Sequence, residues 1–202
     1  MRQDNFSAFD RDWTPPEFST LLRRATDPWE SHLGGIMNTL VPEPEIPSHQ
    51  GPDAQCVDPA LDVITMAVKV PETLAHLHYW SVQLTRPAST EEVLDAFAAS
   101  SRIALIRTDA GLSALNTVKE LMADLGRPHD NLYEVALWSD MLKVEGDELF
   151  YAYMVDNQAI VIPETIDAVR ALTGTMSNAK ESIAKTDATL GIGLLTQIAG
   201  RR

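Results

Sequence analysis

The sequence has one cysteine and no long run of apolar residues. Cys56 is the only cysteine among the 202 residues, which excludes an internal disulfide framework and favours a reducing compartment. No stretch of 18 apolar residues occurs, and the residues after Met1 contain no apolar signal-peptide core. These absences indicate a soluble protein, which we expect to be cytoplasmic.

Basic residues are also scarce. The chain holds 16 Lys and Arg against 29 Asp and Glu, for a formal net charge of −13. A broad negative field repels both the phosphates of nucleic acids and anionic membrane surfaces. We therefore expect neither a nucleic acid nor a membrane as a partner.

Two common site signatures are missing. No Gly-x-Gly-x-x-Gly motif follows an expected strand, so the chain encodes no dinucleotide-binding half. His49, Asp53, His76 and His78 are residue types that bind metals, but their spacing fits no tight zinc signature. We therefore predict no metal site.

Most of the chain divides into short strands and amphipathic helices. We expect strands at 18–24, 36–41, 62–70, 74–80, 103–107, 132–138 and 148–155, and helices at 89–99, 113–125, 163–172 and 178–190. Several connections are too short for a parallel crossover. The pattern predicts an α+β fold with a mixed, mostly antiparallel sheet and helices packed on one face.

The candidate functional residues lie on the expected strand at 74–80 and in a polar loop earlier in the chain. His76 and His78 stand two residues apart, so a strand places both imidazoles on one face, where acid–base chemistry is possible. A pair of structural histidines is the alternative. The loop from Ser48 to Asp53 is bounded by Pro and Gly, a typical setting for a site. Nothing beside Cys56 would activate its thiol, so we expect it to be buried or half-buried and structural.

Six blocks carry a family resemblance by their shared order and spacing. They are Arg23–Pro28, Pro47–Asp53, Val70–His78, Asn131–Glu134, Val161–Arg170 and Lys180–Thr186. Together they resemble the catalytic half of archaeal-type (type II) glyceraldehyde-3-phosphate dehydrogenase. The resemblance implies a remnant of the central helix and a linker at 1–17, a catalytic domain at 18–175, and a C-terminal helix at 176–202 that would return to a nucleotide-binding domain absent here.

The resemblance also implies an activity. Such enzymes oxidise glyceraldehyde 3-phosphate to 1,3-bisphosphoglycerate with NAD or NADP and inorganic phosphate, in glycolysis or gluconeogenesis, as homotetramers. A cysteine thiolate upstream of the matching segment attacks the aldehyde. This chain is therefore expected to be a truncated or split form, inactive alone. A non-catalytic remnant or oligomerisation domain is the alternative.

Individual residues inherit roles from the resemblance. His76 matches the histidine paired with the catalytic cysteine, and His78 is the fallback. The residues matching phosphate contacts are Arg23, Arg24, Ser48, His49, Gln50 and Gly51. Gln50 replaces a histidine of the family, which removes a chargeable group from that loop.

The residues expected near the cofactor resemble those of the family less closely. Asn157 and Gln158 stand where the family presents Gln-Glu near the nicotinamide amide, and a simple turn is the alternative. The residues that read the ribose lie outside this chain, so the choice between NAD and NADP stays open.

Overall fold

The computed structural model describes residues 2–6, as backbone, together with 40–72 and 74–195. The chain divides into two compact units. The first unit comprises Met1–Ser89 and Leu142–Ala152, and the second comprises Thr90–Met141 and Tyr153–Arg202. Strand β9 (Glu148–Asp156) contributes residues to both.

Most of the described elements of the first unit are strands. Its other elements are β1 (Arg2–Phe6), β2 (Val41–Pro42), α3 (Gln50–Val57), β3 (Asp62–Met66), β4 (Val68–Lys69), β5 (Ala75–Gln83) and β8 (Lys143–Glu145). The strand order is β3–β1–β5–β9, with β8 paired to β9 and a separate β2–β4 pair. Strand β1 is parallel to β3 and antiparallel to β5. The β8–β9 connection is a tight turn at Gly146, where φ is 66°.

Three expectations in the first unit need correction. Residues 2–6 form a strand instead of turns of a helix, and their backbone pairs with strands on both sides. The expected loop after His49 is helix α3, because Pro52 lies in the first turn, where no amide hydrogen is needed. Cys56, on that helix, is exposed and not buried. The expected strand at 18–24, with Arg23 and Arg24, lies outside the described residues.

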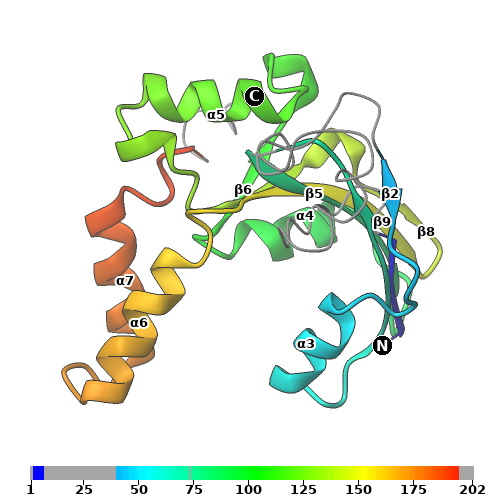
Figure 1. Ribbon diagram of the computed structural model, residues 1–202, viewed down its shortest axis with the longest axis horizontal. Helices are drawn as coiled ribbons and strands as arrows, with labels where there is room; N and C mark the ends of the chain where they lie inside the picture. Colours follow the sequence, from blue (N-terminus) through cyan, green and yellow to red (C-terminus); the bar gives the residue numbers. More distant parts are fainter. Residues whose placement is uncertain (1, 7–39, 73, 196–202) are drawn as a thin grey trace, which may run out of the picture. The chain divides into compact units, whose positions relative to one another are not determined.

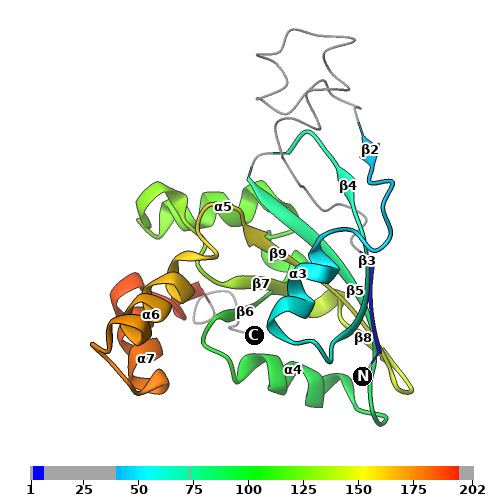
Figure 2. The same ribbon diagram turned by 60° about the horizontal axis from the view of Figure 1, so that its bottom comes forward.

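Four of the five helices that the structure describes belong to the second unit. Its elements are α4 (Thr90–Ala98), β6 (Ile103–Ile106), α5 (Leu115–Asp124), β7 (Val135–Trp138), α6 (Ile162–Thr173) and α7 (Ala179–Leu190). Strand β7 is parallel to β6 and antiparallel to β9. Helices α6 and α7 lie side by side (Figures 1 and 2). Each ends at a glycine in the left-handed conformation, Gly174 and Gly191.

Each unit buries apolar side chains of its own. Buried residues of the first unit include Val63, Ala75, Val82, Leu149 and Ala152, and those of the second include Ala104, Ile106, Ala136, Leu137 and Met154 on strands and Val118 and Met122 on helix α5. With mixed strand pairing and five helices among the described residues, the α+β class is confirmed. In the described part of the chain, no helix has the length and apolarity needed to cross a membrane. The division at residues 17 and 175 stays a prediction.

Candidate functional site

Strand β5 places two histidines and a tryptophan on one face of the first unit. The ring centroids of His76 and His78 are 5.8 Å apart, with the planes inclined by 38°. Next along the same face, Trp80 stacks on Tyr151 of β9 at 6.2 Å and an interplanar angle of 6°. The expectation that both imidazoles share a face is therefore confirmed. Sequence reasoning missed the Trp80–Tyr151 stack, although the alternation of β5 already placed Trp80 beside His78.

The two histidines are not equivalent. Burial, and next the charge of His76, lower the pKa of His78 to about 4. His78 is therefore neutral at neutral pH. A general base works best when its pKa lies near the working pH, which argues against His78 in that role.

The loop before α3 is held against β3 by Thr65. The Ser48 N–H donates to the Thr65 carbonyl at 2.9 Å, and the Thr65 hydroxyl donates to the Ser48 carbonyl at 2.8 Å. The Gly51 N–H donates to the same hydroxyl at 3.1 Å. A Cβ at Gly51 would lie only 2.9 Å from Thr65 Oγ1, so the close approach requires glycine. Thr65 was not foreseen, because it is fourteen residues away from Gly51.

Two predicted phosphate-loop residues carry unsatisfied atoms. Ser48 Oγ and Gln50 Oε1 are buried and have no hydrogen-bond partner among the described residues. Ser48 is only 1% exposed, and such a buried polar atom is normally paired. His49, by contrast, is exposed. The loop therefore contains two buried polar atoms to which no described residue is hydrogen-bonded.

Asn157 and Gln158 form a turn after β9, within the second unit. Asp156 Oδ1 accepts from the N–H of Gln158 at 2.9 Å and of Ala159 at 3.3 Å, which fixes the turn. Asn157 Oδ1 is buried without a partner in the described part of the chain, and Gln158 is exposed. Asp156 itself is buried and paired with Lys119, a contact that sequence reasoning missed.

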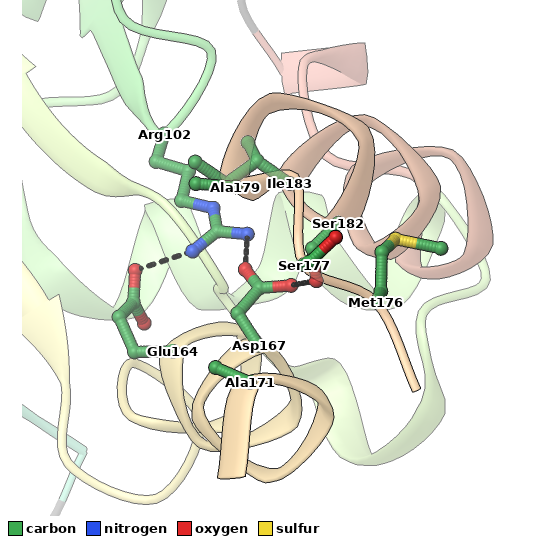
Figure 3. A pocket seen from close by; sticks show the side chains of 9 residues that line it. All are labelled: Arg102, Glu164, Asp167, Ala171, Met176, Ser177, Ala179, Ser182 and Ile183. Carbon is green, nitrogen blue, oxygen red and sulfur yellow. Dashed lines mark hydrogen bonds and ion pairs between the residues drawn. The ribbon is translucent and has the colours of Figure 1, made fainter. Parts of the chain in front are cut away.

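A separate ionic cluster joins α6 and α7 to the residue before β6. Arg102 contacts Glu164 at 2.9 Å, Asp167 at 2.5 Å and Asp187 at 3.0 Å. Figure 3 shows its guanidinium directed at Glu164 and Asp167, beside a pocket of about 310 Å³. The pocket is completed by Ala171, Met176, Ser177, Ala179, Ser182 and Ile183.

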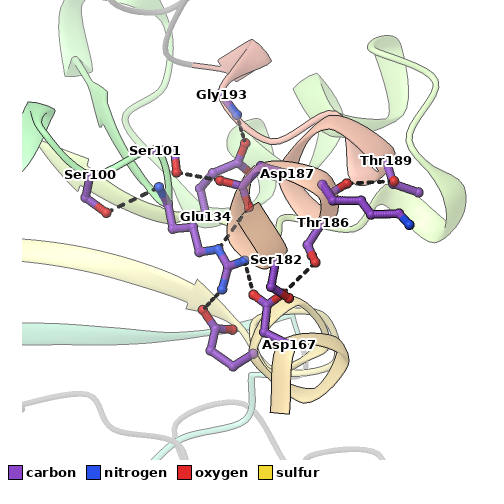
Figure 4. Close-up of polar contacts among 12 residues, drawn as sticks. Ser100, Ser101, Glu134, Asp167, Ser182, Thr186, Asp187, Thr189 and Gly193 are labelled. Atoms are coloured by element: carbon purple, nitrogen blue, oxygen red, sulfur yellow. Dashed lines mark hydrogen bonds and ion pairs between the residues drawn. The ribbon is translucent and has the colours of Figure 1, made fainter. Parts of the chain in front are cut away.

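Asp167 is the centre of this cluster. Its Oδ1 accepts from Ser182 at 2.6 Å and from Thr186 at 2.7 Å (Figure 4). Burial alone would raise the pKa of Asp167, but the hydrogen bonds from Ser182, Thr186 and Arg102 outweigh it and lower the pKa to about 2. Both carboxylate oxygens of Asp167 have partners. The contacts of this ionic cluster therefore stabilise the packing of α6 against α7.

The resemblance block ending at Glu134 also has a structural role. Arg127 donates twice to Glu134, at 2.5 and 2.7 Å, and both side chains are almost fully buried. Glu134 accepts from the Gly193 N–H at 3.0 Å, and Arg127 donates to the Gly191 carbonyl at 2.8 Å. The pair therefore anchors the end of α7, as Figure 4 shows for Glu134 and Gly193.

The sequence predicts no metal site. Within residues 40–72 and 74–195, no group of three His, Cys, Asp or Glu side chains is placed to hold a metal ion.

Comparison with known proteins gives one family and many relatives. Residues 29–140 match the family described as glyceraldehyde 3-phosphate dehydrogenase, C-terminal domain. A glyceraldehyde-3-phosphate dehydrogenase of Haloarcula marismortui is 42% identical over 174 residues, which are 86% of this chain and 49% of that protein. One of Pyrobaculum calidifontis is 44% identical over 171 residues, 84% of this chain and 49% of that protein. The chain therefore spans about half the length of these relatives.

A more distant likeness exists among solved structures. An aspartate semialdehyde dehydrogenase from Francisella tularensis has a TM-score of 0.47 and 13% identity, covering 77% of this chain and 52% of that one. This likeness is too weak to support an argument.

Proposed function

Because the chain belongs to the glyceraldehyde 3-phosphate dehydrogenase C-terminal domain family, we propose that it is the catalytic half of a phosphorylating enzyme of this kind. The reaction is the NAD- or NADP-dependent oxidation of glyceraldehyde 3-phosphate to 1,3-bisphosphoglycerate, in glycolysis or gluconeogenesis. The nucleophilic thiol and the nucleotide-binding domain come from polypeptide outside these 202 residues. The chain alone is inactive.

The observation that carries the proposal is the pair of imidazoles on β5, 5.8 Å apart, in a member of this family. His76 is the general base. It takes the proton of the attacking thiol, and such positioned proton transfer contributes about 10²–10⁴-fold to a rate. His78 supports it, since the lowered pKa of His78 keeps that ring neutral.

The anion site of the proposal is the loop of Ser48, His49, Gln50 and Gly51. The buried Ser48 hydroxyl, which lacks a partner among the described residues, is a donor suited to a phosphate oxygen. Arg23 and Arg24 complete the site in this proposal, because a guanidinium donates two parallel hydrogen bonds to a phosphate. Both glyceraldehyde 3-phosphate and inorganic phosphate need such donors.

Asn157 is the proposed contact to the nicotinamide carboxamide. Its Oδ1 is a buried acceptor without a partner in the described ranges, and a carboxamide NH2 is a matching donor. Gln158, exposed at the same turn, provides a further polar contact. When bound, NAD or NADP accepts the hydride. The choice between the two is not made by these residues.

The proposal can be tested with a two-part enzyme, assembled from two separately encoded polypeptides. We would express the chain together with the N-terminal half of the Haloarcula relative and follow reduced cofactor with glyceraldehyde 3-phosphate and phosphate as substrates. The His76→Gln variant should lose turnover by about 10²–10⁴-fold, and His129→Gln, at an exposed histidine of the second unit, should not. Equal rates for His76→Gln and the unmodified chain would contradict the proposal.

Association is the second part of the proposal. The chain assembles as a homotetramer, and light scattering on the two-part enzyme measures the mass directly. Tetramers without any turnover would favour a non-catalytic remnant or oligomerisation domain instead.

A further inference from the structure

We propose that the buried ion pair between Lys119 and Asp156 positions Asn157 for the cofactor. The inference rests on the proposed function, in which Asn157 contacts the nicotinamide carboxamide. It names two positioning residues that act through Asn157 and touch no reacting group. All three residues belong to the second unit.

The Asp156 carboxylate accepts hydrogen bonds from three parts of this unit. Its Oδ2 accepts from the Leu132 N–H at 3.1 Å and from the Lys119 ammonium, which comes from α5. Its Oδ1 accepts from the N–H groups of Gln158 and Ala159, in the turn after β9. Asp156 is buried, so these contacts are shielded from water. One oxygen is therefore held by neighbouring elements, and the other holds the turn.

Lys119 determines how firmly the carboxylate is held. In the part of the chain that the structure describes, Lys119 is the cation paired with Asp156, and both side chains are largely buried. A hydrogen bond between charged groups is stronger than one between neutral groups. Without the ammonium, a buried negative charge would be left uncompensated and would move toward other donors or water. Oδ1 would move with it, and the turn would lose its fixed acceptor.

The turn that Asp156 fixes carries an unsatisfied polar atom. Asn157 lies between Asp156 and Gln158 in the sequence, so the hydrogen bond that joins these two residues closes around it. The side chain of an asparagine in a turn commonly bonds to nearby backbone. Here Asn157 Oδ1 is buried and has no hydrogen-bond partner among the described residues. The turn therefore holds an acceptor in place for a donor that the described residues do not supply.

A fixed acceptor binds a ligand better than a mobile one. A group that is already held in its binding orientation loses little conformational freedom when the ligand arrives. A hydrogen bond also weakens steeply when the donor and the acceptor are misaligned. The ion pair therefore contributes to cofactor affinity through the orientation of Asn157, and we expect it to leave the affinity for glyceraldehyde 3-phosphate unchanged.

A double-mutant cycle in the two-part enzyme tests this order of action. Lys119→Met should raise the KM for NAD or NADP by about tenfold, the factor that one hydrogen bond is worth, and leave the KM for glyceraldehyde 3-phosphate unchanged. Asn157→Ala should have the same effect. In the Asn157→Ala background, Lys119→Met should not raise the KM for the cofactor further, because Lys119 acts through Asn157. Lys119→Arg, which keeps the cation, should restore most of the affinity.

Arg170→Met is the control for a general loss of stability. Arg170, in the last turn of α6, donates to Asp167 and to the Ser182 carbonyl. Its loss should lower the free energy of unfolding without changing the KM for the cofactor. If Lys119→Met does not fold, Lys119→Gln, which keeps a donor without the charge, replaces it in the cycle. An unchanged KM for the cofactor in the Lys119 variant, or an equal rise with and without Asn157→Ala, would overturn the proposal.

A second measurement needs neither turnover nor the other polypeptide. In the 202-residue chain, Lys119→Met should speed amide hydrogen exchange at Gln158 and Ala159, and Arg170→Met should not. Unchanged exchange in Lys119→Met would also overturn the proposal.

The two measurements distinguish this inference from the proposed function. If the unmodified two-part enzyme binds reduced cofactor without turnover, the proposed function fails. The dissociation constant of the reduced cofactor then replaces the KM in the cycle. If turnover is normal and Lys119→Met changes neither the KM for the cofactor nor the exchange, only this inference fails.

Discussion

The polar groups of the two units are satisfied to different degrees. In the second unit, Arg102 contacts three carboxylates, and Asp167 has partners on both oxygens. In the first unit, Ser48 Oγ and Gln50 Oε1 are buried without a partner among the described residues. Both regions bury polar atoms. In the first unit the Thr65 hydroxyl is paired with the loop, whereas the Ser48 and Gln50 atoms have no such contact among the described residues.

Buried polar atoms without a described partner indicate where a ligand could bind. A saturated cluster stabilises a fold, whereas unsatisfied buried atoms weaken it unless something else pairs with them. Asn157 Oδ1 in the second unit belongs to the unsatisfied kind, and it too is a predicted site residue. Arg127 Nε is a further unsatisfied atom, and nothing among the described residues explains it.

The largest loss of stability is expected when the buried ion pair between Arg127 and Glu134 is broken. Arg127→Met leaves the Glu134 carboxylate buried, at 0% exposure, without its bidentate partner. Breaking a buried ion pair in this way costs about 3–5 kcal/mol. The free energy of unfolding from a urea titration measures the loss.

Its matched control is an exposed pair. Arg107 and Asp109 are also bidentate, but their side chains are 41% and 63% exposed. Arg107→Met should leave the free energy of unfolding almost unchanged. Similar losses for the two variants would remove the distinction between buried and exposed pairs.

A smaller effect is expected at Asp167. Asp167→Asn keeps an acceptor for Ser182 and Thr186 but turns an amide donor toward Arg102, at a cost of about 2 kcal/mol. The folded pKa of Asp167, about 2, lies below its ordinary value of 3.8, so acid protonates the unfolded chain first. The stability from this carboxylate is therefore lost as the pH falls from 3.8 towards 2.

The measurement is the free energy of unfolding of both proteins across that pH range. The unmodified chain should approach Asp167→Asn as the pH falls. If the difference in free energy of unfolding between the two proteins stays constant down to pH 2, the charge of Asp167 contributes nothing to stability.

The smallest effect on stability is expected at the unsatisfied hydroxyl. Ser48→Ala removes an atom without a described partner, so the free energy of unfolding should change by less than about 1 kcal/mol. Stabilisation by added inorganic phosphate, which follows the affinity for the folded state, should decrease. Thr65→Val, which removes the hydroxyl bonded to Ser48 and Gly51, should instead lower stability without phosphate. A large loss in Ser48→Ala would contradict the contrast drawn above.

Local patterns in the sequence predicted much of the fold. The helices α4, α5, α6 and α7 lie close to their expected positions, because each carries an amphipathic repeat and most have a terminal signal such as Pro163 or Gly174. The shared face of His76 and His78 followed from strand alternation alone.

The rest depends on contacts between distant residues. Arg102 and Asp187 are 85 residues apart in the sequence, and Arg127 and Gly191 are 64 apart. No local sequence pattern predicts contacts over such separations. Helix α3 was missed because Gly51 and Pro52 are both typical of loops. The roles of Arg23 and Arg24 remain predictions, because both lie outside the described residues.

The contact between Gly51 and Thr65 limits how this chain can evolve. One added methyl group at position 51 would lie 2.9 Å from the hydroxyl of a residue in another element. A lineage that acquires a side chain at 51 must therefore also lose or move the hydroxyl at 65. The two positions are expected to vary together or not at all.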